Sequence, residues 1–235
     1  MKILPDWLKN LYLRLIDPVA DGLVRLGVHP NTITAFGTAC TIAAAVIFGM
    51  GHIRTAGVFL GLTALFDVLD GTVARRSGKE STFGAFFDST LDRLADGAIF
   101  VGLATFYALD PVHHSAWMML LCMSGLVGAL MTSYARARAE ALGIDAKVGM
   151  VQRAERVVLL SVPQAFFGLA LNGWVLKAVV GIITVGAWIT VIQRVMFVYR
   201  QTSNRVDAEP LRLPVERSSP LPLRREGKRS LLKGE

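Results

Sequence analysis

Long apolar stretches dominate this chain, and they limit most strongly the fold that it can adopt. Six stretches are each near the roughly 20 residues that a helix needs to cross a bilayer, and they cover about 32–51, 55–75, 88–108, 116–138, 155–172 and 177–198. The 235 residues are 53% hydrophobic and only 18% charged, which is too apolar for an ordinary soluble domain. We therefore predict an all-α integral membrane protein with about six transmembrane helices, in one membrane domain over residues 1–200.

The two ends of the chain depart from this apolar pattern. Residues 4–26 repeat apolar residues at helical spacing with charged residues elsewhere on the wheel, which predicts an amphipathic helix lying in the membrane interface. The Pro30–Asn31–Thr32 step predicts the start of the first span, with Asn31 as its N-cap. Residues 201–235 are rich in proline and basic residues, which predicts a disordered basic tail.

The net charge of +7 is concentrated in the connecting segments and the tail. Basic residues follow the second span and fill the segment between the fourth and fifth spans, whereas residues 109–115 contain no Lys or Arg. The positive-inside rule therefore predicts cytoplasmic termini in a multi-pass protein of the plasma membrane. Such a distribution indicates contact with membrane lipids of negative charge rather than with nucleic acid.

Four carboxylates interrupt the apolar sequence at Asp67, Asp70, Asp88 and Asp92. An ionised side chain in a membrane is unfavourable by roughly 2.5–3.5 kcal/mol, so a cluster of four needs positive charge beside it. The two pairs are spaced i, i+3 and i, i+4, and a short cytoplasmic connector joins their helices, so all four are expected at one membrane depth. Oxygen donors without His or Cys favour Mg²⁺, Mn²⁺ or Ca²⁺, and four of them suffice for two ions.

Two glycines and an arginine accompany these carboxylates. Gly71 and Gly84 remove side chains where a ligand backbone or a diphosphate must approach closely, and Arg75 is placed to pair with a phosphate. Two other interpretations remain open at this point. The acids could be helix-end charges neutralised by Arg75, Arg76 and Arg93, or they could form the ion pathway of a divalent-cation transporter. Neither alternative explains the glycines.

A second cluster, of arginines, falls on the same side of the membrane at the ends of the last three spans. Each arginine alone could reflect membrane topology, but five around one vestibule favour a ligand that carries phosphate, because guanidinium binds phosphate in a bidentate manner. The cluster consists of Arg136, Arg138, Arg153, Arg156 and Arg194, with Ser133 as a further polar contact.

The acidic segment matches a known family signature at every fixed position. The pattern D-x2-D-G-x2-A-R-x8-G-x3-D-x3-D is met by Asp67, Asp70, Gly71, Ala74, Arg75, Gly84, Asp88 and Asp92. It resembles the signature of the CDP-alcohol phosphatidyltransferases, and the likeness in span count and basic loops extends over about residues 5–200.

This resemblance implies a reaction and a set of roles. CDP-diacylglycerol would lie with its diphosphate on two Mg²⁺ or Mn²⁺ ions, an acceptor alcohol would attack the lipid-side phosphorus, and CMP would leave. Asp67, Asp70 and Asp88 would hold metal, while Asp92 would bind metal and take the acceptor's proton. The positions implied for the CDP-lipid are Asn31, Thr32, Ile33, Thr34, Gly71, Arg75 and Ser81. A homodimer through the spans is also implied.

The acceptor is indicated by residues 133–160, which resemble the phosphatidylinositol phosphate synthases within this family. These enzymes join 1D-myo-inositol 3-phosphate to the lipid. By position, the acceptor's phosphate pocket would be lined by Ser133, Arg136, Arg138, Arg153, Arg156 and Arg194. Arg136 and Ala154 depart from the Lys and Pro of that pattern. We therefore predict synthesis of phosphatidylinositol phosphate and CMP from CDP-diacylglycerol and a phosphorylated polyol.

Two further enzymes remain as alternatives, one inside this family and one from a different class. A phosphatidylglycerophosphate synthase uses glycerol 3-phosphate, whose phosphate would suit the same arginines. An intramembrane prenyltransferase also holds a diphosphate with aspartate-bound Mg²⁺, but its acidic motifs lie on separated segments, whereas all four acids here fall within residues 67–92.

Overall fold

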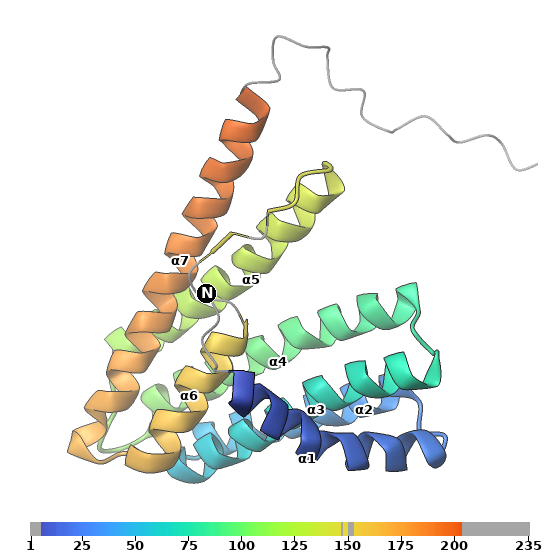
Figure 1. Cartoon of the computed structure of the whole chain (residues 1–235). Helices are drawn as coiled ribbons and strands as arrows, with labels where there is room; N and C mark the ends of the chain where they lie inside the picture. Colours follow the sequence, from blue (N-terminus) through green and yellow to red (C-terminus); the bar gives the residue numbers. More distant parts are fainter. Residues whose placement is uncertain (1–5, 147, 150–152, 204–235) are drawn as a thin grey trace, which may run out of the picture.

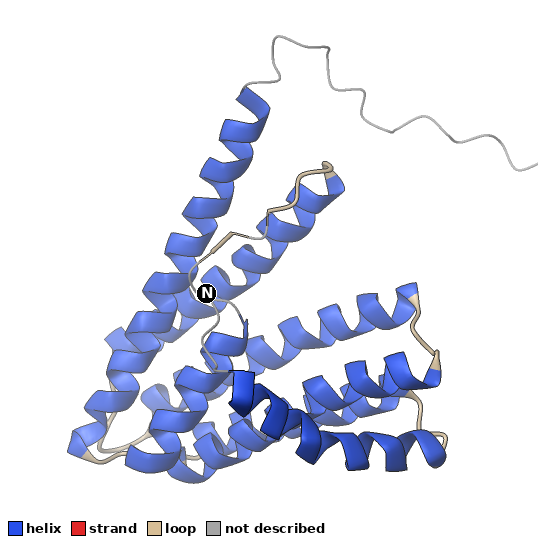
Figure 2. Ribbon diagram, in the orientation of Figure 1, coloured by secondary structure: helices blue, strands red, loops and turns tan. Residues whose placement is uncertain are grey.

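A computed structural model gives the fold of the chain, and it describes residues 6–146, 148–149 and 153–203. These residues form helices and no strand, which confirms the predicted all-α class (Figures 1 and 2). In chain order the elements are α1 (Asp6–Arg25), α2 (Pro30–Gly49), α3 (Ile53–Ser77), α4 (Thr82–Leu109), α5 (Ala116–Ala141), α6 (Arg153–Phe167), the 3₁₀ helix η1 (Leu171–Gly173) and α7 (Trp174–Ser203).

Six of the helices pack as a closed ring. Helix α2 packs against α3 and α4, α3 continues to α6, α6 to α7, α7 to α5, and α5 returns to α4. Buried aromatic and aliphatic side chains from all six helices fill the centre, including Phe48, Leu60, Phe100, Tyr107 and Ile183. Helix α2 therefore packs against both helices that carry the acidic motif.

Glycines allow two of these helix contacts to be close. A side chain at Gly57 of α3 would overlap the backbone of α6, and one at Gly102 of α4 would overlap the backbone of α2 at Ala45. Small residues at such crossings are typical of helix pairs in membranes, where backbones approach closely in the absence of a hydrophobic drive. The ring therefore depends on glycines outside the acidic motif as well as on its apolar side chains.

Four helical segments are long and apolar enough to cross a membrane, namely α2, α3, α5 and the continuous η1–α7 segment. The other two predicted spans are helical as well, but the count of about six spans is not confirmed. Helix α4 carries Asp88, Asp92, Arg93 and Asp96 within its first 15 residues. Helix α6 has 15 residues and is about 22 Å long, which is less than the roughly 30 Å of a hydrocarbon core.

Helix α1 lies outside the ring, against α3. Ile16 and Ala20 are buried with Val73 of α3, and Arg76 donates to the carboxylates of Asp17 and Asp21. The helix predicted over 4–26 is therefore present as Asp6–Arg25, and a location in the membrane interface stays a prediction.

Two predicted boundaries differ from the structure. Helix α2 begins at Pro30 rather than after Asn31, and His29 is the N-cap because its Nδ1 accepts from the backbone N–H of Asn31 at 3.2 Å. Proline suits the first helical position because it has no backbone N–H, and an N–H at that position would have no acceptor within the helix. Helix α7 continues to Ser203, so the predicted tail 201–235 starts inside a helix. The rest of that predicted tail, 204–235, lies outside the described residues.

Candidate active site

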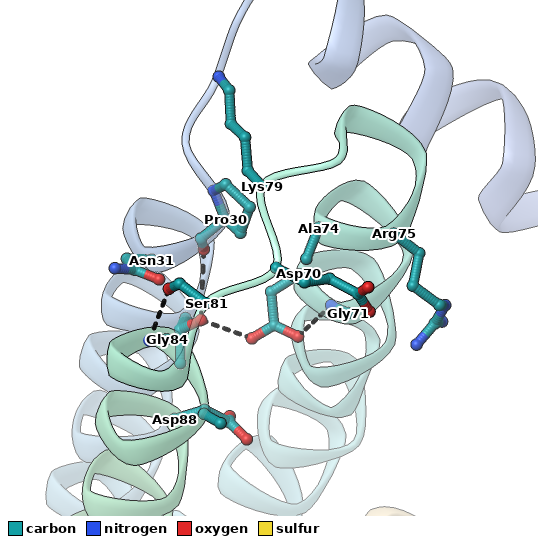
Figure 3. A pocket seen from close by; sticks show the side chains of 13 residues that line it. Pro30, Asn31, Asp70, Gly71, Ala74, Arg75, Lys79, Ser81, Gly84 and Asp88 are labelled. Atoms are coloured by element: carbon teal, nitrogen blue, oxygen red, sulfur yellow. Dashed lines mark hydrogen bonds between the residues drawn. The ribbon is translucent and has the colours of Figure 1, made fainter.

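The acidic motif spans the turn between α3 and α4. Gly78 ends α3 in the left-handed conformation, with φ of 64°, and Ser81 caps α4 by accepting the Gly84 N–H at 2.9 Å. This short connection sets the last turns of α3 and the first turns of α4 beside a shared space. Side chains of Asp70 and Asp88 point into that space from opposite sides (Figure 3).

Asp70 is the most firmly held of the four carboxylates. It is buried, and its Oδ2 accepts a 2.7 Å hydrogen bond from the hydroxyl of Thr34 on α2. Its Oδ1 accepts from the backbone N–H of Gly71. Two donors on different helices therefore fix the orientation of this carboxylate, as Figure 3 shows for the Gly71 contact.

Asp67 and Asp92 meet across the site at one guanidinium group. Nη1 of Arg153, in the first turn of α6, contacts Asp67, and Nη2 lies 3.1 Å from Oδ1 of Asp92. Asp88 lies near enough to repel both Asp67 and Asp92. The carboxylates of α3 and α4 thus face a common region that contains the positive charge of Arg153.

The donor set suits a hard divalent cation, since it contains carboxylate oxygens and no imidazole or thiolate. The Arg153 guanidinium lies among these carboxylates and bridges Asp67 and Asp92, and Nη1 of Arg93 lies 3.8 Å from Oδ2 of Asp92. Among the described residues, no three His, Cys, Asp or Glu side chains lie as closely as an ion requires. The donor set therefore fits the predicted ion by its chemistry, whereas the described carboxylates are not gathered around one point as they would be about a bound ion.

A cavity of about 230 Å³ lies between α3, α4 and the first turn of α2, and we call it the glycine-lined cavity. It is lined by Pro30, Asn31, Thr34, Asp70, Gly71, Ala74, Arg75, Lys79, Glu80, Ser81, Gly84, Ala85 and Asp88. It thus brings together five of the seven residues that the sequence assigns to the CDP-lipid.

The other two assigned residues, Thr32 and Ile33, do not line this cavity. Thr32 is exposed, and Ile33 is buried among apolar side chains of α1 and α3. The helical repeat explains the division, because residues 31 and 34 share one face of α2 and residues 32 and 33 point elsewhere.

Both motif glycines lie where a side chain would meet the lining of the cavity. A Cβ at Gly84 would be 3.0 Å from Oγ of Ser81 and 3.3 Å from Oδ1 of Asn31. A Cβ at Gly71 would be 3.4 Å from Nη1 of Arg75, whose side chain folds back along α3. The glycines therefore keep open the space that a diphosphate would need.

A second cavity, of about 210 Å³, lies between α4, α5, α6 and α7, and we call it the arginine-lined cavity. Its lining residues are Asp92, Arg93, Asp96, Thr132, Ser133, Arg136, Arg153, Ala154, Arg156 and Arg194. Five of the six residues predicted for the acceptor's phosphate are therefore together beside Asp92. The sixth, Arg138, is exposed and is not among the lining residues.

The arginines of this cavity are held by acids and carbonyls. Arg194 donates through Nε to the carbonyl of Val148 at 2.9 Å and through Nη1 to the carbonyl of Thr132. Arg136 pairs with Glu140 at 2.8 Å on the exposed side of α5. Arg156 is paired with Asp96. These hydrogen bonds and ion pairs thus fix the position of each of the three guanidinium groups in the wall of the cavity.

The sequence leaves the role of Asp96 open between an ion pair with Arg93 and support of the site, and in the structure Asp96 lines the cavity and pairs with Arg156. The available signal was its spacing of i, i+4 from Asp92, which places both acids on one face of α4. Lys79 and Glu80 of the glycine-lined cavity were likewise unassigned, because they stand in a turn that carries no periodic pattern.

Comparison with known proteins defines the class to which this fold and site belong. The family model for CDP-alcohol phosphatidyltransferase matches residues 27–199, and the chain belongs to this family. The predicted enzyme class, a phosphatidyltransferase of lipid biosynthesis, is thereby confirmed.

Individual relatives narrow the resemblance. The chain is 36% identical over 204 residues to the phosphatidylinositol phosphate synthase of Mycobacteroides abscessus, covering 86% of this chain and 91% of the relative. It is 37% identical over 188 residues to the archaetidylinositol phosphate synthase of Methanothermobacter thermautotrophicus, covering 80% and 90%. These names agree with the subgroup indicated by residues 133–160.

Solved structures agree as well. The crystal structure of Mycobacterium tuberculosis phosphatidylinositol phosphate synthase with CDP-DAG bound superposes with a TM-score of 0.73 at 33% identity, over 79% of this chain and 94% of that one. The same enzyme in complex with manganese and citrate gives a TM-score of 0.71 at 33% identity, over 78% and 88%.

Proposed function

We propose that this protein transfers the phosphatidyl group of CDP-diacylglycerol to 1D-myo-inositol 3-phosphate, giving phosphatidylinositol phosphate and CMP. The observation that carries the proposal is the arginine-lined cavity, in which Asp92 stands beside Arg153, Arg156 and Arg194. A general base next to several guanidinium groups suits an acceptor that carries both a hydroxyl and a phosphate. Relatives with this acceptor in their names support the choice.

In the proposed reaction the two cavities hold the two substrates. The diphosphate of the lipid occupies the glycine-lined cavity, near Asp70, Gly71 and Arg75. Asp67, Asp70, Asp88 and Asp92 would hold Mg²⁺ or Mn²⁺, two ions in our proposal. When bound, these ions neutralise the diphosphate and stabilise the leaving CMP.

Asp92 performs the proton transfer in this proposal. Its carboxylate takes the proton of the acceptor hydroxyl, and the resulting oxygen attacks the lipid-side phosphorus. The bond from that phosphorus to the bridging oxygen breaks, and CMP leaves with the electron pair. The arginines hold the acceptor's phosphate so that its hydroxyl lies beside both Asp92 and the phosphorus.

We further propose that the active site opens to the cytoplasm from the plasma membrane, and that the protein is a homodimer. The orientation is supported by the basic segments at one end of the bundle, since arginines and lysines favour the cytoplasmic side. The dimer is supported by the family resemblance.

The test is release of CMP by the purified protein supplied with CDP-diacylglycerol and Mg²⁺ or Mn²⁺. We expect release with 1D-myo-inositol 3-phosphate and far slower release with unphosphorylated myo-inositol, because the arginine-lined cavity then lacks its anion. Equal rates with the two acceptors would refute the role of the arginines. Loss of CMP release in the presence of EDTA, and its recovery on addition of Mg²⁺, would support the proposed ion.

A further inference from the structure

Asp96 and Arg156 form a buried ion pair between α4 and α6. Asp96 is 8% exposed and Arg156 is 4% exposed. Oδ2 of Asp96 accepts from Nη2 of Arg156, and Oδ1 lies 3.8 Å from Nε of Arg153. One carboxylate thus faces both arginines that α6 presents to the arginine-lined cavity.

The donors of Arg156 are only partly used by this pair. Its Nε and Nη1 are buried and have no hydrogen-bond partner among the described residues, and Nε of Arg153 has none either. Buried guanidinium donors without acceptors are strongly unfavourable, because the group is charged. The donors point to an anionic ligand with several acceptor oxygens, which phosphate provides in the geometry that guanidinium prefers.

We propose that Asp96 is a positioning residue for the acceptor: it fixes Arg156 so that the free donors of this arginine bind the acceptor's phosphate. This inference rests on the proposed function. Asp96 does not touch the reacting atoms in this account. It lies one helical turn beyond Asp92, so the same face of α4 carries the base and the residue that sets the anion site.

A simpler role would be compensation of charge, in which Asp96 only offsets the surrounding arginines. The two roles predict opposite results. Removing a carboxylate that merely offsets charge leaves the cavity more positive and strengthens anion binding. Removing a carboxylate that orients Arg156 weakens anion binding, because the guanidinium loses the partner that holds its plane.

The experiment is a double-mutant cycle of Asp96→Asn and Arg156→Gln, with the KM of both substrates measured in the full-length protein. We expect Asp96→Asn to raise the acceptor KM about tenfold and to leave the KM of CDP-diacylglycerol unchanged. In the Arg156→Gln background it should add no further effect, since there is then no guanidinium to orient. An unchanged or lowered acceptor KM in Asp96→Asn, or additive effects in the double variant, would overturn the proposal.

Inorganic phosphate separates this inference from the proposed function. It should raise the Tm of the wild-type protein, and most of that rise should be lost in Asp96→Asn. If the wild type does not use inositol phosphate, the proposed function fails, while the phosphate-induced Tm rise still tests Asp96. An equal rise in both proteins refutes the role of Asp96 and leaves the proposed function standing.

Two further variants complete the design. Asp110→Asn is the matched control at the other end of α4, where the carboxylate accepts from the backbone of Val112 and His113, and it should leave the acceptor KM unchanged. If Asp96→Asn does not fold, Asp96→Glu keeps the charge and moves the carboxylate by one methylene. It should still raise the acceptor KM, and a wild-type value would overturn the proposal.

Discussion

The two cavities of the active site are built in different ways. The glycine-lined cavity takes nearly all its lining from residues 70–88 and the first turn of α2. The arginine-lined cavity takes its lining from four helices, α4 to α7, with long charged side chains that reach inward. The first is shaped by small residues and backbone that leave room for a diphosphate, whereas the second is shaped by guanidinium groups that need acids and carbonyls to hold them.

This contrast suggests a division of work between the lipid substrate and the acceptor. Changes in the glycine-lined cavity should act on the lipid and the ions, and changes in the arginine-lined cavity should act on the acceptor. Asp92 lines the arginine-lined cavity and belongs to the acidic motif, whose other residues line the glycine-lined cavity. Because it stands between the two substrates, a change at Asp92 should lower kcat itself.

The largest effect is expected for Asp92→Asn. An amide cannot accept the acceptor's proton, so kcat should fall by roughly 10²- to 10⁴-fold. CDP-diacylglycerol should still bind, and this binding can be measured as the rise in Tm that the lipid produces. Turnover close to that of the wild type would rule out Asp92 as the base.

The next largest effect is expected at Arg153, and it should distinguish Arg153 from Arg138, although both were predicted to bind the acceptor's phosphate. Arg153→Ala should raise the acceptor KM about 10- to 100-fold and the lipid KM far less, because it removes charged donors from the arginine-lined cavity. Arg138→Ala is the comparison, since Arg138 is exposed and outside that lining. Equal effects on both substrates in Arg153→Ala, or equal effects of the two variants, would show that the cavity is wrongly assigned.

A moderate effect is expected at Thr34, whose hydroxyl orients Asp70. Thr34→Val should weaken the binding of Mn²⁺ about tenfold, because loss of a partner that orients a metal ligand typically has this consequence. Binding can be followed by electron paramagnetic resonance, apart from activity.

Two variants control for packing at this position. Thr34→Ser keeps the donor and should restore Mn²⁺ binding. Thr41→Val removes a buried hydroxyl further along the same face, where Thr41 donates to Thr63 at 3.2 Å, and should leave Mn²⁺ binding unchanged. A weakening as large in Thr41→Val as in Thr34→Val would contradict the role of Thr34.

The smallest effect is expected for Gly84→Ala. The added methyl would press on Ser81 and Asn31, so the KM of CDP-diacylglycerol should rise a few-fold while the acceptor KM stays constant. Gly181→Ala on α7, where a methyl meets no atom within 4 Å, should change neither value. A rise in the acceptor KM alone would break the assignment of the glycine-lined cavity to the lipid.

The same contrast explains how much could be predicted from the sequence. The glycine-lined cavity follows a continuous motif, so Asp70, Gly71, Arg75 and Gly84 could be assigned from their spacing, whereas Ser81 could be assigned only through the family resemblance. The all-α class could be predicted from the apolar stretches. Thr32 and Ile33 were assigned with their neighbours because a four-residue match does not resolve the faces of a helix, and only the packing of Ile33 against α1 and α3 separates them.

The arginine-lined cavity could be predicted only in outline. Five arginines could be grouped by membrane depth, but depth does not give rotation about a helix, and Arg138 points away from the face used by Arg136. The pairing of Asp96 with Arg156 joins residues 60 positions apart, which spacing cannot reveal. Among the described helices, four rather than six meet a purely hydropathic criterion for a span, because α4 carries charges and α6 is short.

Competition between phosphorylated acceptors tests the central claim most directly. The purified protein would receive CDP-diacylglycerol, Mg²⁺ and equal concentrations of 1D-myo-inositol 3-phosphate and glycerol 3-phosphate, and the lipid products would be quantified by mass spectrometry. The account predicts that phosphatidylinositol phosphate predominates and that its formation matches the CMP released. Predominance of phosphatidylglycerophosphate would contradict it.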